Sequence, residues 1–192
     1  MIAKQLSATI KVSRLHAQVV ELSLTDPLTG LHNRRYFDLF LTNEIIRGHR
    51  FSYKLAIIMV DIDRFKDYND QFGHPIGDLA LQQVADYLTN GCRAIDVVTR
   101  IGGEEFAIVL PETDAEGALI CAEKLRTSVA AVSNLKRPIT ISLGIAMLSE
   151  NSHTPEALLQ QADQALYQAK RTGRNRVCIF SEKIMDKGLR EV

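Results

Sequence analysis

The chain has 192 residues, 46% of them apolar, and its 23 basic residues balance its 23 acidic ones. This is the size of one domain with a short extension, with enough apolar residues for a core. The balanced charge argues against DNA or RNA as a partner, because such proteins carry a basic field. The sequence contains no run of about 18 apolar residues, so it predicts no membrane-spanning helix. It also contains no apolar block near the N-terminus of the kind found in a signal peptide.

The three cysteines, Cys92, Cys121 and Cys178, are odd in number and far apart in the sequence. This spacing is typical of reduced thiols in a cytoplasmic protein rather than of a disulfide framework.

Residues 1–25 have apolar side chains at alternating steps of four and three: Ala8, Val12, Leu15, Val19 and Leu22. The spacing is typical of a coiled-coil seam, so it predicts a helical stalk. A helix packed on its own domain fits the same pattern. Pro27 ends the helix, because the residue before a proline disfavours the α conformation. We expect the globular domain to occupy residues 26–181, followed by a polar tail over residues 182–192.

Helical and strand periodicities alternate within this domain. Helices are predicted over 33–47, 76–88, 115–132 and 155–171, and strands over 55–60, 96–100, 106–110, 139–146 and 177–180. The first strand (LAIIMV) is continuously apolar, as in a strand buried on both faces. The order is β-α-β-β-α-β with an extra helix and strand. It predicts an α/β fold (an α+β sandwich) with a ferredoxin-like or palm-type central sheet flanked by helices.

Two pairs of carboxylates lie at the ends of predicted strands: Asp61 with Asp63, and Glu104 with Glu105. In the predicted topology these strands are neighbours, so we expect Asp61 and Glu104 to face one another. Together with the Ile62 carbonyl they would form an all-oxygen site for Mg²⁺ or Mn²⁺, ions that commonly serve phosphate chemistry. The Gly-Gly-Glu-Glu turn alone is more often a solvated turn with charged flanks.

Other residues near these carboxylates suit a nucleotide. The candidate phosphate ligands are the cations Lys66, Lys170, Arg171 and Arg174. Taken singly, each is as well explained as a surface cation or a cation at a helix C-terminus. Asn69 and Asp78 offer an amide and a carboxylate that match the edge of guanine, with His74 close by. The alternative for these three residues is turn and helix-start chemistry.

Five blocks of the sequence resemble, in the same order, those of the diguanylate cyclase family: DPLTGLHNRR, VDIDRFKDYNDQFGHPIGD, RIGGEEF, TISLGIA and ADQALYQAKRTGRN. Residues 102–106 match the family signature Gly-Gly-Asp/Glu-Glu-Phe, and the resemblance extends from Asp26 to about Phe180. It implies that two GTP molecules are joined into cyclic di-GMP with release of two pyrophosphates. Each domain would hold one GTP, so the resemblance also implies a homodimer with two domains face to face.

The resemblance assigns roles to the candidate residues. The implied metal ligands, for two Mg²⁺ or Mn²⁺ ions, are Asp61, the Ile62 carbonyl, Glu104 and Glu105. The two glutamates are also the implied catalytic residues, and Glu104 is the usual candidate to deprotonate the 3′-hydroxyl. The implied GTP ligands are Phe65, Lys66, Asn69, His74, Asp78, Lys170 and Arg174.

Arg93 and Asp96 form an Arg-x-x-Asp motif shortly before the signature. In the family this motif implies an inhibitory site that binds the product as an intercalated dimer. Lys124 stands where the family often has a second arginine, and lysine lacks its bidentate geometry. Arg126 is a possible substitute, and Arg47 is a further candidate that would reach the product of a neighbouring domain. The alternative is a local Arg-Asp pair at a turn, worth less than ~1 kcal/mol.

The resemblance further implies a sensor or receiver domain upstream of the stalk, and we expect this chain to be an excerpt of a longer protein. Three other functions stay open: a non-catalytic member that only binds nucleotide, a cyclase with a different product, and a purely structural dimerisation module. The intact carboxylates argue against the first and third, and Asn69 with Asp78 favours guanine over adenine.

Overall fold

The computed structural model describes residues 24–149, 152 and 154–181. The predicted stalk lies outside these residues except for Leu24 and Thr25, and the predicted tail lies wholly outside them.

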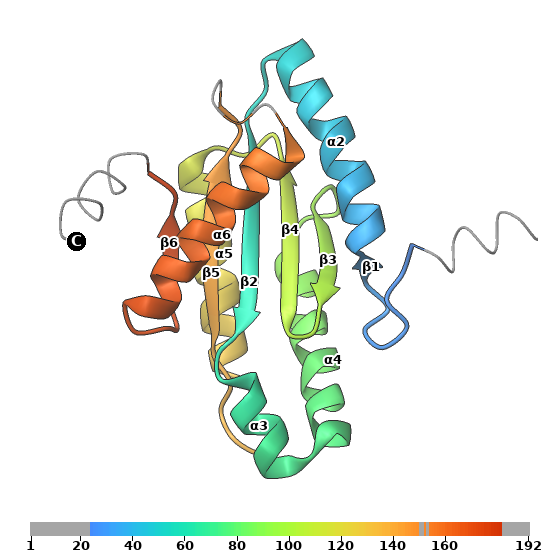
Figure 1. Ribbon diagram of the computed structural model, residues 1–192, viewed down its shortest axis with the longest axis vertical. Coiled ribbons are helices and arrows are strands. Elements are labelled where there is room, and N and C mark those ends of the chain that lie inside the picture. Colours follow the sequence, from blue (N-terminus) through green and yellow to red (C-terminus); the bar gives the residue numbers. More distant parts are fainter. Residues whose placement is uncertain (1–23, 150–151, 153, 182–192) are drawn as a thin grey trace, which may run out of the picture.

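One mixed sheet forms the centre of the domain, with its strands in the order β1-β3-β4-β2-β5-β6 (Figure 1). The strands are β1 (His32–Asn33), β2 (Leu55–Ile62), β3 (Val97–Gly102), β4 (Glu105–Pro111), β5 (Ile141–Met147) and β6 (Val177–Ile179). The inner four pair antiparallel, and the short edge strands β1 and β6 pair parallel. This arrangement confirms the predicted ferredoxin-like sheet with added elements.

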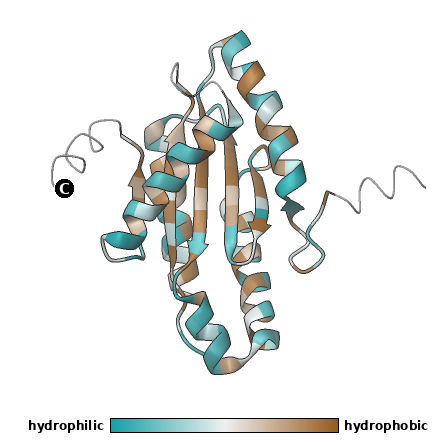
Figure 2. Cartoon of the chain, viewed as in Figure 1, coloured by the Kyte–Doolittle hydropathy of each residue, from teal (hydrophilic) through white to brown (hydrophobic). Residues whose placement is uncertain are grey.

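Helices cover both faces of this sheet. One face packs against α2 (Arg34–Phe51) and α6 (Pro155–Arg171), and the other against α4 (His74–Gly91) and α5 (Ala115–Ala130). All of β2 is buried, and its side chains alternate between the two apolar layers, which explains its continuously apolar sequence (Figure 2). None of the helices within the described ranges has the length and apolar character needed to cross a membrane.

Four of the differences from the predicted elements have a clear local cause. Helix α3 (Phe65–Phe72) was not predicted, because only Phe65 and Tyr68 of its eight residues are buried and the rest read as a polar loop. The edge strand β1 is two residues long, too short for a periodicity to appear. Helix α2 continues to Phe51 and ends where Ser52 adopts a left-handed conformation (φ 54°). Helix α4 begins at His74, with a proline in its first turn, where proline costs no hydrogen bond.

Candidate active site

The C-terminal end of β2 and the turn between β3 and β4 lie at the same end of the sheet (Figure 1). The antiparallel register of β2 and β4 places Asp61 opposite Glu105. Glu104 lies one residue further into the turn, where its carbonyl accepts a hydrogen bond from the Ile62 N–H at 3.3 Å. The expected facing pair of Asp61 and Glu104 is therefore corrected to Asp61 and Glu105. The reason is the unbroken antiparallel register of β2 and β4, in which Leu55 pairs with Pro111 and Asp61 therefore pairs with Glu105, the first residue of β4.

Asp61 is a buried carboxylate with one cationic partner. The residue is 7% exposed, and Lys170 Nζ on α6 lies 2.6 Å from its Oδ2 atom. Burial raises the pKa of Asp61 above its ordinary value, while the hydrogen bond and charge of Lys170 act in the opposite direction. The nearby carboxylates of Glu105 and Asp63 raise this pKa further. The site therefore favours an additional positive charge.

The donor atoms at this strand end fit a hard divalent cation. No three His, Cys, Asp or Glu side chains within the described part of the chain converge as a complete metal site. The Asp61 carboxylate nevertheless lies opposite Glu105, and Ile62, with its backbone carbonyl, follows Asp61 at the end of β2. Carboxylate and carbonyl oxygens are the ligands that Mg²⁺ and Mn²⁺ prefer.

Asp63 has a different role from Asp61. Its carboxylate accepts hydrogen bonds from Thr140 Oγ1 at 2.7 Å, Ser142 Oγ at 2.6 Å and the Asn175 N–H at 3.0 Å. These bonds tie the loop after α6 to the ends of β2 and β5. Asp63 therefore fixes the backbone beside Arg174, and its oxygens are already occupied by donors.

The predicted phosphate-binding cations lie around this strand end in two cavities. Lys170 lines a cavity of about 230 Å³ together with Glu105 and Arg34. Arg174, which has a left-handed backbone (φ 62°), lines a second cavity of about 350 Å³. This cavity also contains Asp63 and two arginines that the sequence analysis did not single out, Arg64 and Arg137. Arg171 instead lies over the ring of Tyr167.

The predicted guanine and phosphate ligands on α3 and α4 lie near one another in the helical pair. The side chains of Lys66, His74 and Asp78 are exposed. Phe65 is 5% exposed and belongs to the core, so only its backbone is left to contact a ligand. The first turn of α3 has no side-chain cap, which leaves its N–H groups available to an anion.

Asn69 has an unusual environment in this helical pair. Its Oδ1 atom is buried and has no hydrogen-bond partner among the described residues. The amide fits there only because residue 77 is glycine: a Cβ at Gly77 would lie 1.8 Å from Asn69 Oδ1. Buried amide oxygens are normally paired, so this atom is suited to a ligand that donates a hydrogen bond.

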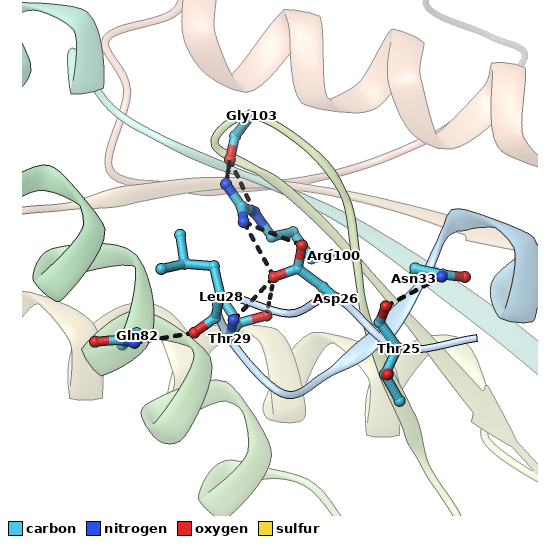
Figure 3. A network of polar contacts seen from close by, with 8 residues as sticks. All are labelled: Thr25, Asp26, Leu28, Thr29, Asn33, Gln82, Arg100 and Gly103. Carbon is cyan, nitrogen blue, oxygen red and sulfur yellow. Dashed lines mark hydrogen bonds and ion pairs between the residues drawn. The ribbon is translucent and has the colours of Figure 1, made fainter. Parts of the chain in front are cut away.

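A polar network missed in the sequence connects the start of the domain to the signature turn (Figure 3). Arg100 donates to Asp26 through Nη1 at 3.0 Å and to the Gly103 carbonyl through Nη2 at 2.8 Å. Asp26 also accepts from the Thr29 N–H and hydroxyl at 2.9 and 2.7 Å. Burial acts to raise the pKa of Asp26, but these bonds from Thr29 and Arg100 outweigh it and lower the pKa. The only sequence signal was that both residues lie inside family blocks, DPLTGL and RIGGEEF.

The predicted inhibitory motif is a closed ion pair. Arg93 Nη2 donates to Asp96 Oδ1 at 2.7 Å and to Thr113 Oγ1 at 2.6 Å, and the Arg93 N–H donates to Asp96 Oδ2 at 2.7 Å. The side chain of Arg93 is 52% exposed and that of Asp96 only 1%. Lys124 Nζ lies close by and donates to the Gly91 carbonyl at 3.1 Å.

The two further arginines considered for this motif have other partners. Arg126 donates to Glu123 at 2.8 Å and to Asn175 at 3.0 Å, and so is engaged with the loop after α6. Arg47 on α2 forms an ion pair with Glu44 at 2.6 Å. The structure thus places Lys124, but not Arg126, beside the Arg93 turn.

Comparison with known proteins agrees with this geometry. The family model described as "Diguanylate cyclase, GGDEF domain" matches residues 23–176. The response regulator PleD of Caulobacter vibrioides is 43% identical over 164 residues, which are 82% of this chain and 36% of PleD. The diguanylate cyclase DgcP of Pseudomonas aeruginosa is 43% identical over 159 residues, which are 81% of this chain and 24% of DgcP. This chain therefore spans about a third of the length of PleD and about a quarter of the length of DgcP.

Solved structures of isolated domains match over most of their length. The GGDEF domain of DgcB from Caulobacter crescentus in complex with c-di-GMP has a TM-score of 0.80 and 33% identity, covering 83% of this chain and 94% of that one. The active GGEEF domain of a diguanylate cyclase from Vibrio cholerae has a TM-score of 0.75 and 37% identity, covering 78% of this chain and 97% of that one.

Proposed function

Because this chain belongs to the diguanylate cyclase family of GGDEF domains, we propose that it joins two GTP molecules into cyclic di-GMP and releases two pyrophosphates. One observation carries the proposal. The register of β2 and β4 brings a buried carboxylate, Asp61, opposite Glu105 and beside Lys170 at the open end of the sheet. Anionic metal ligands next to a cation are what a triphosphate site needs.

We place the guanine of GTP against Asn69, with Asp78 and His74 at its edge. The unpaired Oδ1 atom of Asn69 supports this placement, because the N1–H and N2–H₂ groups of guanine are donors that would satisfy it. The phosphates would then lie over the uncapped first turn of α3, at the backbone of Phe65 and Lys66. Lys170 and Arg174 supply positive charge from the other side of the strand end.

Members of this family generally use a divalent metal. We assign as its ligands Asp61, the Ile62 carbonyl, Glu104 and Glu105, which would hold two Mg²⁺ or Mn²⁺ ions. When bound, such ions neutralise phosphate charge and lower the pKa of a coordinated hydroxyl. The 3′-hydroxyl oxygen of one GTP forms a bond to the α-phosphorus of the other, and the bond to the pyrophosphate oxygen breaks. Glu104 is our candidate to accept the hydroxyl proton.

A single domain offers one such site, so the reaction needs two domains whose substrates meet in antiparallel orientation. We propose a catalytic homodimer for this reason. We also propose that cyclic di-GMP binds at Arg93, Asp96 and Lys124, where an exposed guanidinium can open toward a phosphate or guanine.

The test is a product assay with GTP and Mg²⁺ at several protein concentrations. We expect cyclic di-GMP and pyrophosphate in a 1:2 ratio, with a rate that rises more steeply than linearly with protein. Glu104→Gln should abolish the product, whereas Glu116→Gln, an exposed glutamate in the first turn of α5, should not. The opposite outcome is a chain that binds GTP but makes no product at any concentration, even when two copies are joined covalently. Such a chain would be the non-catalytic nucleotide-binding member considered above.

A further inference from the structure

Cys92 and Cys121 lie side by side at the end of α4, although 28 residues separate them in the sequence. Cys92 caps the C-terminus of α4, and Cys121 lies on α5. The two thiols interact directly with each other, and both pack partly exposed against the same apolar core. The third thiol, Cys178 on β6, interacts with no other cysteine in the described part of the chain.

Two further contacts hold α4 and α5 together at this point. Lys124 Nζ on α5 donates to the carbonyl of Gly91, the residue before Cys92, at 3.1 Å. Gly91 itself lies so close to α5 that a Cβ would be 2.2 Å from Leu125 Cδ2. Both contacts hold the end of α4, next to Cys92, against the part of α5 that follows Cys121 by one turn.

The thiol pair also adjoins the charged cluster of Arg93, Asp96 and Lys124. Cys92 directly precedes Arg93 in the sequence, and the charges of Asp96 and Lys124 act on both thiols. The interaction with Cys121 raises the pKa of Cys92, and burial adds to this effect. The same interaction lowers the pKa of Cys121, which makes Cys121 the better nucleophile of the two.

We propose that Cys92 and Cys121 are a redox pair that closes to a disulfide on reaction with a hydroperoxide and thereby weakens binding of cyclic di-GMP at Arg93 and Asp96. The sulfur of Cys121 attacks the hydroperoxide, the O–O bond breaks, and a sulfenic acid and an alcohol (water, for hydrogen peroxide) are formed. The sulfur of Cys92 then attacks the sulfenic sulfur, the S–O bond breaks, and the hydroxyl leaves with a proton as water. Two thiols are oxidised and one hydroperoxide is reduced.

The closed disulfide acts on Arg93 through the backbone. It fixes Cys92 to α5 and so holds the turn 92–96 in the arrangement in which Arg93 is already bonded to Asp96 and Thr113. A product that recruits the Arg93 guanidinium has to open these bonds, which is harder when the turn is cross-linked. The second part of the inference rests on the product site proposed above, whereas disulfide formation does not.

The experiment treats the chain with hydrogen peroxide under native conditions and maps disulfides by mass spectrometry before and after reduction. We expect a peptide that links Cys92 to Cys121, lost in Cys92→Ser and Cys121→Ser and retained in Cys178→Ser. Calorimetric titration should then show about fivefold weaker cyclic di-GMP binding by the oxidised chain, reversed by dithiothreitol. Absence of the Cys92–Cys121 link overturns the inference, and a link that leaves the affinity unchanged overturns its regulatory part. An inactive chain that still forms the link contradicts only the cyclase proposal.

Discussion

Lys170 on the last long helix and Asp61 at the end of the central strand form an ion pair at 2.6 Å in which the carboxylate side chain is 10% exposed. The pair links the two segments that carry the proposed phosphate and metal ligands. Asp61 is more deeply buried than Lys170, so solvent or a nucleotide phosphate would reach the pair from the lysine side. A phosphate or metal that enters the site would compete for these same charges.

Replacing Lys170 with glutamine should impair both stability and activity. The buried Asp61 would lose its counter-charge, which we expect to cost about 1–3 kcal/mol of unfolding free energy, less than for a fully buried pair because Lys170 is partly exposed. Arg171→Gln is the matched control, since Arg171 follows Lys170 in the sequence but lies over the Tyr167 ring. Urea unfolding and initial rates with GTP measure the two effects. Equal losses in both variants would contradict a specific role of the pair.

The same variant should shift the pH dependence. The pKa of Asp61 is already raised by burial, and Lys170 partly offsets this rise. Loss of Lys170 should raise the pKa of Asp61 further and so move the acidic limb of the rate profile to higher pH. An acid whose pKa is raised by folding binds protons more tightly in the folded state, so its contribution to stability falls as pH increases. The stability deficit of Lys170→Gln should therefore be larger at pH 7 than at pH 4.5, and a deficit independent of pH would argue against this account.

Asp63→Asn should loosen the loop after α6. The substitution removes the charge from three hydrogen bonds, to Thr140, Ser142 and the Asn175 N–H, and replaces one acceptor oxygen with a donor. We expect a loss of about 1–3 kcal/mol and a higher KM for GTP, because Arg174 lies in this loop. Asp86→Asn, at an exposed position of α4, is the control. Hydrogen exchange should localise the change to residues 172–176, and unaltered exchange there would refute the anchoring role.

Arg100 should act as a positioning residue for the signature turn. Arg100→Lys keeps the charge but loses the simultaneous contacts with Asp26 and the Gly103 carbonyl. We expect kcat to fall more than KM rises, and a double-mutant cycle with Asp26→Asn to give a coupling of about 1–3 kcal/mol. Arg50→Lys, an exposed residue at the end of α2, should be neutral. Additive effects of the Arg100 and Asp26 changes would mean that the pair does not act as a unit.

The pH dependence of that coupling has a defined sign. The pKa of Asp26 is lowered by its partners despite burial, so the pair contributes its full stabilisation above the ordinary value of 3.8. The contribution is lost as pH falls through the lowered pKa. The coupling measured at pH 7 should therefore decrease in unfolding experiments as the pH is lowered below 3.8.

Gly77→Ala should displace Asn69 without unfolding the domain. The added methyl group would lie 1.8 Å from Asn69 Oδ1, at the end of a side chain that can rotate away. We expect GTP affinity to fall about tenfold, or ~1.4 kcal/mol, with little change in melting temperature. Gly117→Ala on α5, where the nearest atom would be 3.1 Å away, is the control. Unchanged GTP affinity would place the guanine elsewhere.

The sequence by itself determined the architecture, because the apolar periods of its elements are strong. The continuously apolar LAIIMV run indicated a strand buried on both faces, and the structure buries all of β2. The β-α-β-β-α-β order left the ferredoxin-like sheet as the natural arrangement, and the five family blocks identified the residues of the candidate site. Helix α3 was not predicted because only Phe65 and Tyr68 of its eight residues are buried.

Only the tertiary structure decided which of these residues meet. Adjacent residues of a strand point to opposite faces, so the choice between Glu104 and Glu105 opposite Asp61 depended on the register between β2 and β4. The pairs Lys170–Asp61, Arg100–Asp26 and Cys92–Cys121 join segments far apart in the chain. Local periodicity reports only which face of an element is buried, whereas contacts between distant segments depend on strand register and helix packing.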